Sequence, residues 1–152
     1  MLLYIYHPAE FGEGQPFKLY LHHDGRLTAW VYCDIQLTDF HPVERYTQVI
    51  EFPQLTENEI EEVKYALENQ CYYSIDHEES PVDGWFERFT IRDNGKTRDW
   101  RIDPSNYYMV EGIYSKQRPH ILRLRELLQV QWCIDNGDGI KRVLEEDIAK
   151  KN

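Results

Sequence analysis

Two short clusters of this 152-residue sequence carry side chains that are able to ligate a metal ion. The first is residues 22–24 in the stretch "HHDGR", and the second is residues 76–79, "DHEE", with Cys71 shortly before it. Zinc accepts all of these ligand types, but its ligands recur roughly two to four residues apart on a turn or about four apart on a helix. Adjacent strand residues point to opposite faces, so His22 and His23 of a regular hairpin cannot grip one ion. We therefore predict no metal site and no cofactor.

Other catalytic chemistry has little support in the sequence. There is no GxSxG nucleophile motif, and "GEG" and "GDG" lack the lysine and the strand-loop-helix setting of a phosphate-binding loop. Cys33, Cys71 and Cys133 are odd in number, lack CxxC spacing and lie in apolar contexts, which predicts inert thiols in a reducing cytoplasm. We predict no catalytic residues, although the 27 acidic residues and six histidines leave a chance acid-base pair open.

Two hairpins with related turns account for the first cluster better than a metal does. Asp24-Gly25 and Asn94-Gly95 each stand between runs rich in β-branched and aromatic residues. This pattern is typical of type I′ turns, in which both central residues take positive φ. Two-residue loops at these positions set the register of each hairpin and place one pair of large side chains on its core face. The predicted core pairs are Leu19 with Trp30 and Phe89 with Trp100.

The opposite faces of the two hairpins differ in polarity. In the first hairpin Tyr20, Ala29, Val31 and Cys33 make the second face apolar as well, which predicts either a central position in the sheet or an element that covers this face. In the second hairpin that face is polar, so we expect it to meet solvent or a polar partner. Its residues are Arg88, Thr90, Arg92, Thr97, Asp99 and Arg101.

Each hairpin is followed by another apolar strand and a helix, so the element order is β-β-β-α twice. Thr56 and Glu59 have capping-box spacing at the start of the first helix. Pro119 suits the first turn of the second helix, and Gly137 is expected to end it. The order predicts an α+β fold, in which an antiparallel meander-type sheet has helices packed on one face. The predicted organisation is one domain over residues 1–152, with pseudo-repeat halves 1–70 and 71–137 and a C-terminal helix at 138–151.

Negative charge is concentrated in one part of the chain. The formal net charge is −10, and residues 34–87 hold 14 acidic residues against two basic ones. A field of this sign repels nucleic-acid phosphates and attracts basic proteins, so nucleic acid is a disfavoured partner despite the bases at residues 88–125. The apolar opening "MLLYIY" is too short for a membrane span or a secretion signal. It predicts an N-terminal strand and no membrane partner.

These features favour a non-enzymatic module that binds a basic protein. Aromatic side chains beside carboxylates suit a surface that holds Lys and Arg side chains. A cytoplasmic immunity protein that neutralises a bacterial toxin, such as a nuclease, has this composition, although the comparison is one of composition alone. The sequence leaves the identity of the partner and the oligomeric state open. The predicted partner-binding residues are Glu57, Glu61, Glu62, Glu68, Tyr72, Tyr73, Asp76, Glu78, Glu79 and Trp85.

The alternative is a small enzyme or ligand-binding domain. Its cleft would lie over the polar face of the second hairpin, where Arg88, Arg92 and Arg101 would receive an anionic group. A deep pocket lined by these arginines would favour this alternative over the protein-binding module.

Overall fold

The described strands form one antiparallel sheet of six strands in the order β4-β3-β2-β1-β5-β6. A computed structural model of the chain describes residues 3–8, 14–70, 87–102 and 118–151. The predicted N-terminal strand is confirmed as β1, which lies between the two hairpins. The strands are β1 (Leu3–His7), β2 (Phe17–Leu21), β3 (Leu27–Ile35), β4 (Glu44–Phe52), β5 (Glu87–Asp93) and β6 (Lys96–Ile102).

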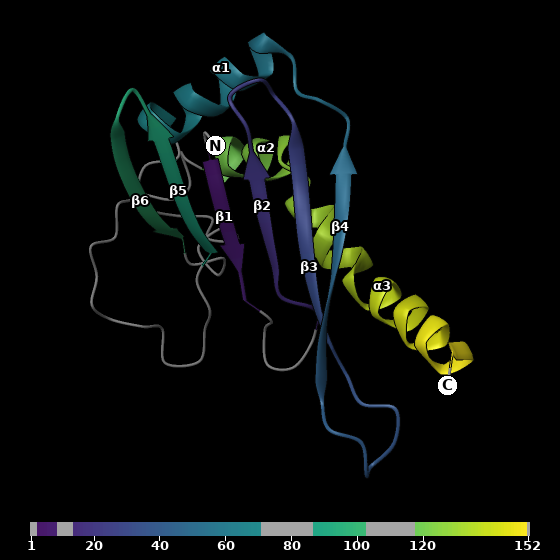
Figure 1. Cartoon of the computed structure of the whole chain (residues 1–152). Coiled ribbons are helices and arrows are strands. Elements are labelled where there is room, and N and C mark those ends of the chain that lie inside the picture. Colours follow the sequence, from purple (N-terminus) through teal and green to yellow (C-terminus); the bar gives the residue numbers. More distant parts are fainter. Residues whose placement is uncertain (1–2, 9–13, 71–86, 103–117, 152) are drawn as a thin grey trace.

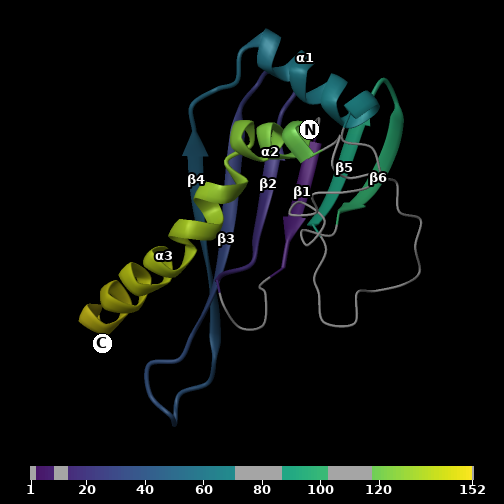
Figure 2. The ribbon, with the colours of Figure 1, turned by 180° about the vertical axis from the view of Figure 1, so that it is seen from behind.

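The helices cover one face and one end of this sheet. Helix α1 (Glu57–Tyr65) continues into the π-helical turn η1 (Ala66–Gln70) and crosses the end at which the β2–β3 and β5–β6 turns lie, as Figure 1 shows. Helices α2 (Arg118–Leu127) and α3 (Val130–Lys151) pack against a single face of the sheet (Figure 2). The predicted α+β fold is confirmed. None of the described helices is long and apolar enough to cross a membrane.

The core lies between the sheet and the helices, and strict alternation along the strands supplies it. In β2 and β3 the odd-numbered residues are buried, whereas the even-numbered ones reach the opposite, outer face. Period-two alternation is the pattern of a sheet with one face packed and the other open. The largest fully buried side chains are Phe17, Phe89, Leu3, Ile5, Leu19, Leu21, Leu27, Leu67, Leu124 and Leu128.

The predicted register of the first hairpin is wrong by one residue. Leu19 lies opposite Ala29, and Trp30 lies opposite Lys18 on the outer face. A shift of one residue moves every side chain of the partner strand to the other face. Consequently Ala29, Val31 and Cys33 belong to the core instead of a second apolar face, and 41% of Trp30 is exposed.

The second hairpin has the predicted register. Phe89 lies opposite Trp100, and Asp93 lies opposite Lys96, which leaves a two-residue turn. Both turn residues, Asn94 and Gly95, have positive φ, as a type I′ turn requires. The polar residues of β5 and β6 are cross-strand partners in the predicted register. These pairs are Arg88 with Arg101, Thr90 with Asp99 and Arg92 with Thr97.

Helix α1 begins as predicted. The Thr56 hydroxyl accepts a hydrogen bond from the backbone N–H of Glu59, and the Glu59 carboxylate accepts one from the N–H of Thr56. This reciprocal capping box satisfies two of the donors that a helix start leaves unpaired. Ile60 and Val63 then bury the inner face of the helix, as their spacing predicts.

The boundary between the last two helices differs from the prediction. Gly137 lies inside α3, and the break falls at Gln129, whose φ of 60° cannot continue a helix. Gly137 is buried because Gln15 packs against it, and a Cβ there would lie 3.3 Å from the Cβ of Gln15. The Gln15 side-chain amide also donates to Asp138 at 3.0 Å. The close approach of Gln15 to α3 therefore explains why a residue without a side chain occupies position 137. The third strand predicted for the second half, residues 106–114, lies outside the described residues.

Candidate functional site

The stretch "HHDGR" contains a three-residue hairpin loop, residues 23–25. The N–H of Gly25 donates to the carbonyl of His22 at 3.0 Å, and the N–H of His22 donates to the carbonyl of Arg26 at 2.9 Å. His22 and Arg26 are therefore paired, and only Gly25 takes a positive φ, of 93°. A type I turn closed by a left-handed glycine has this geometry, and its extra residue shifts the register by one.

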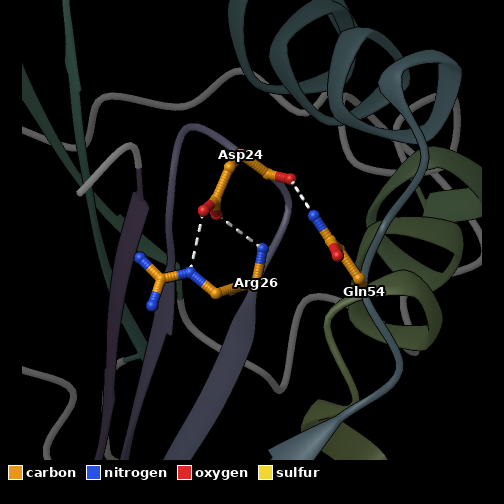
Figure 3. A network of polar contacts seen from close by, with 3 residues as sticks. All are labelled: Asp24, Arg26 and Gln54. Atoms are coloured by element: carbon orange, nitrogen blue, oxygen red, sulfur yellow. Dashed lines mark hydrogen bonds and ion pairs between the residues drawn. The ribbon is translucent and has the colours of Figure 1, made fainter.

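Asp24 holds this loop together (Figure 3). Its carboxylate accepts hydrogen bonds from the backbone N–H of Arg26 at 3.1 Å and from Arg26 Nε at 2.8 Å. The hydrogen bond from the Arg26 backbone N–H is the largest of the effects that hold the pKa of Asp24 below its ordinary value. The Asp24 carbonyl in turn accepts from the side-chain amide of Gln54. The polar groups of Asp24 thus serve the turn and its junction with the segment before α1.

The described residues contain no group of three His, Cys, Asp or Glu side chains that could hold a metal ion. In the first cluster, the Asp24 carboxylate is already engaged by two hydrogen bonds from Arg26. The second cluster, residues 76–79 with Cys71, lies outside the described residues.

Four of the predicted partner-binding residues lie on α1 and η1, at the end of the sheet. Glu57, Glu61, Glu62 and Glu68 are all exposed. Two of them form ion pairs with other elements: Glu62 with Arg123 of α2 at 3.0 Å and Glu68 with Arg98 of β6 at 3.2 Å. The remaining predicted residues lie outside the described part of the chain. They are Tyr72, Tyr73, Asp76, Glu78, Glu79 and Trp85.

These ion pairs show that the acidic and basic parts of the chain meet within one molecule. The Glu62 hydrogen bond raises the pKa of Arg123 above its usual range. Lys64 adds a third link, because its ammonium lies 3.5 Å from Asp93 of β5 and 3.6 Å from Glu61. The field of α1 is therefore partly neutralised by the protein itself, which the segregation of charge along the sequence did not reveal.

A cleft of about 590 Å³ opens between α1 and the β5–β6 turn, and we call it the α1 cleft. Tyr65 is the large aromatic residue of its helical wall, and this residue is 59% exposed. Glu61 and Glu68 flank Tyr65 on the same wall, and Ile91 contributes an apolar surface. The remaining lining residues are Lys64, Asp93, Asn94, Lys96 and Arg98.

The alternative anion site was predicted on the polar face of the second hairpin, which includes Arg88. Arg88 lies 3.6 Å from Asp99, whose carboxylate also accepts a hydrogen bond from Thr90. Neither the α1 cleft nor the cleft between the β3–β4 connection and the end of α3 is lined by Arg88 or Arg92. Arg88 and Arg101 are cross-strand partners in the register of β5 and β6, but Arg88 and Arg92 lie outside both of these clefts.

The outer face of the sheet carries an aromatic cluster that was not predicted from the sequence. The rings of Tyr20 and Trp30 lie 5.7 Å apart, and those of Tyr4 and Tyr20 lie 5.3 Å apart. Lys18 lies on the same face, and its ammonium is 5.5 Å from the centre of the Tyr32 ring. The even-numbered spacing of these residues within "LYIYH", "FKLYL" and "LTAWVYCDI" is the signal that identifies them.

The two described cysteines are buried and poorly suited to nucleophilic chemistry. Burial raises the pKa of the Cys133 thiol to about 12, and it also raises the pKa of Cys33. Because the reactive form of cysteine is the thiolate, a raised pKa keeps both thiols protonated through neutral and mildly alkaline pH.

We expect Cys133 to resist alkylation by iodoacetamide at pH 8 in the folded protein and to react readily in denaturant. Peptide mapping by mass spectrometry measures both states, and Cys33 serves as an internal comparison. Rapid labelling of Cys133 in the folded protein would contradict the buried position that the structure gives it.

Comparisons with known proteins identify no relative of this chain. The chain matches no family model, no curated protein and no solved structure. The residues and their geometry are therefore the basis for assigning a function.

Proposed function

We propose that this chain is a protein-binding module whose α1 cleft receives an arginine or lysine side chain of a basic protein partner. The observation that carries the proposal is the helical wall of the cleft, which exposed Tyr65 lines together with Glu61 and Glu68. A basic side chain can lay its alkyl stem against an aromatic ring while its head meets a carboxylate. Tyrosine is also a common anchor of protein interfaces.

The ion pairs around the cleft are compatible with this role. Glu61, Glu68 and Asp93 each have a cationic neighbour, and all of these pairs remain partly exposed to solvent. Exposed ion pairs contribute only about 0–1 kcal/mol each, so exchanging one for a pair with the partner costs little.

The whole-chain charge supports the same class of partner. A net charge of −10 speeds encounter with a positively charged protein and disfavours nucleic acid. Inhibition of a basic toxin is one biological role that a surface of this kind would serve. That role requires a partner that is itself a toxin, and the capture experiment below would identify it.

Charge reversal on α1 tests the proposal. The Glu57→Lys/Glu61→Lys protein is expected to lose partners that the wild-type protein captures from lysate at low salt and releases at high salt. With a purified partner, the variant should slow association about tenfold or more and change dissociation less, because exposed charges act mainly on encounter. Tyr65→Ala should instead speed dissociation, since it removes the anchor.

A control with the same change of charge is available on α3. Glu146 and Asp147 are exposed in the C-terminal half of α3, and this end of the helix lies away from α1 (Figure 1). Glu146→Lys/Asp147→Lys should therefore bind as the wild type does. Glu62 is unsuitable for this test, because its bond to Arg123 joins α1 to α2. A partner captured equally by both charge-reversed proteins, or the absence of any salt-sensitive partner, would refute the proposed function.

A further inference from the structure

Strand β4 is an edge strand whose outer edge is paired with no described element. It is nine residues long and contains neither proline nor lysine, the residues with which proteins commonly block an exposed edge. The other edge strand, β6, carries four charged residues among seven: Lys96, Arg98, Asp99 and Arg101. The central five residues of β4, from Tyr46 to Ile50, are all uncharged. An unpaired edge with this composition is a template for a further strand.

The sequence of β4 is complementary to itself in one antiparallel register. When Gln48 is placed opposite Gln48 of a second copy, Arg45 falls opposite Glu51, and Glu51 falls opposite Arg45. Opposite charges that face each other across two strands stabilise their pairing. The two registers in which neighbouring residues, Thr47 or Val49, sit at the centre lose both charge pairs.

From this register we infer that two copies of the chain associate through their β4 edges, about a two-fold axis at Gln48, to form one continuous sheet. Backbone hydrogen bonds between the two strands would satisfy donors and acceptors that β4 otherwise leaves to water. A two-fold axis uses the same patch on both copies, as a closed dimer requires.

The neighbours of Arg45 and Glu51 strengthen this inference. Arg45 donates to the Asp34 carboxylate on its β3 side through Nε at 2.8 Å and Nη2 at 3.1 Å, which fixes the guanidinium on the outer face. Glu51 lies opposite Thr28 of β3, and the described residues provide it with no ion-pair partner. In the dimer, Arg45 would lie between Asp34 of its own chain and Glu51 of the second copy.

Apolar side chains lie beside these charges on the same face. Val49 lies opposite Trp30 in the β3–β4 register, and 47% of Val49 is exposed. In the proposed register Val49 falls opposite Thr47 of the second copy. The β-branched pairs on either side of the axis would then cover part of the apolar surface that Val49 and Trp30 present, and such pairs suit strand association.

Disulfide trapping tests both the dimer and its register. On a Cys71→Ser background, Gln48→Cys is expected to form an intermolecular disulfide under mild oxidation, since this residue faces its own copy across the axis. Thr47→Cys and Val49→Cys should each link poorly alone and readily when mixed, because the predicted pair is 47 with 49. Directly opposite strand residues approach closely enough for a disulfide, whereas residues two positions away do not.

Mass and charge measurements complete the test. Light scattering should give a dimeric mass for the wild-type chain, and Glu51→Lys should weaken the dimer about tenfold, because it places a lysine opposite Arg45 at both ends of the paired strands. Glu61→Lys is the matched control, because residue 61 lines a cleft beside β5 and β6 and should leave the dimer intact. A monomer at every concentration, or equal linking of Thr47→Cys with itself and with Val49→Cys, would overturn the inference.

Discussion

Replacing Gly25 by alanine is expected to lower the free energy of unfolding by about 3 kcal/mol or more. The φ of 93° at this residue costs an L side chain roughly 1–2 kcal/mol. In addition, a Cβ would lie only 2.2 Å from the carbonyl oxygen of Leu55, so the backbone must move. That movement would disturb the 2.8 Å hydrogen bond from the Leu55 N–H to the Gly25 carbonyl, which contributes about 1 kcal/mol.

The Gly95→Ala protein provides the matched control. Gly95 also has a positive φ, of 73°, but nothing lies within 4 Å of a Cβ added there. Its loss should therefore be about 1–2 kcal/mol, which is the cost of the backbone conformation alone. Chemical denaturation of the two variants measures the difference. Equal losses would show that the approach of Leu55 to the loop does not constrain residue 25.

The second large effect is expected at Phe17. This side chain is fully buried in the core, where it stacks on His7 with ring centroids 4.5 Å apart. Phe17→Ala should cost about 3–5 kcal/mol of stability, because it removes a large buried surface and leaves a cavity. A loss of this size is a large fraction of the total stability of an ordinary domain.

Trp30→Ala is the informative comparison, because the two possible registers of the first hairpin predict different losses of stability for this substitution. The observed register places Trp30 on the outer face, where it contacts Tyr20, so its truncation should cost only about 1 kcal/mol. A two-residue Asp24-Gly25 turn would bury Trp30 in the core. A loss as large as that of Phe17→Ala, measured by denaturant unfolding, would thus favour that turn and contradict the observed pairing.

Much of the fold can be read from local patterns. The Asn94-Gly95 turn and the Thr56–Glu59 capping box each depend on residues close together in the sequence. Their energetics are local as well, because turn φ values and first-turn hydrogen bonds involve only a few neighbouring residues. These predictions were confirmed for that reason.

The candidate site was less predictable. Acidic residues of α1 were identified from composition, but composition does not show that Glu62 pairs with Arg123 or Glu68 with Arg98. Those pairs join residues 61 and 30 positions apart in the chain, so they exist only after α2 and β6 have packed against α1. The same packing creates the α1 cleft, which Tyr65 lines.

The sequence by itself determined that "HHDGR" is a turn, that the chain forms an antiparallel sheet with helices on one face, and where α1 begins. Tertiary structure alone decided how many residues the turn holds. A type I′ loop and a three-residue loop ending in glycine fit the same residues, and the difference lies in the backbone of Asp24 and in the contacts of Gly25 with Leu55. That single residue of register moved Trp30 to the outer face. Strand order, which left β4 at an edge with Arg45 and Glu51 placed for self-pairing, likewise came from long-range hydrogen bonds that no local pattern encodes.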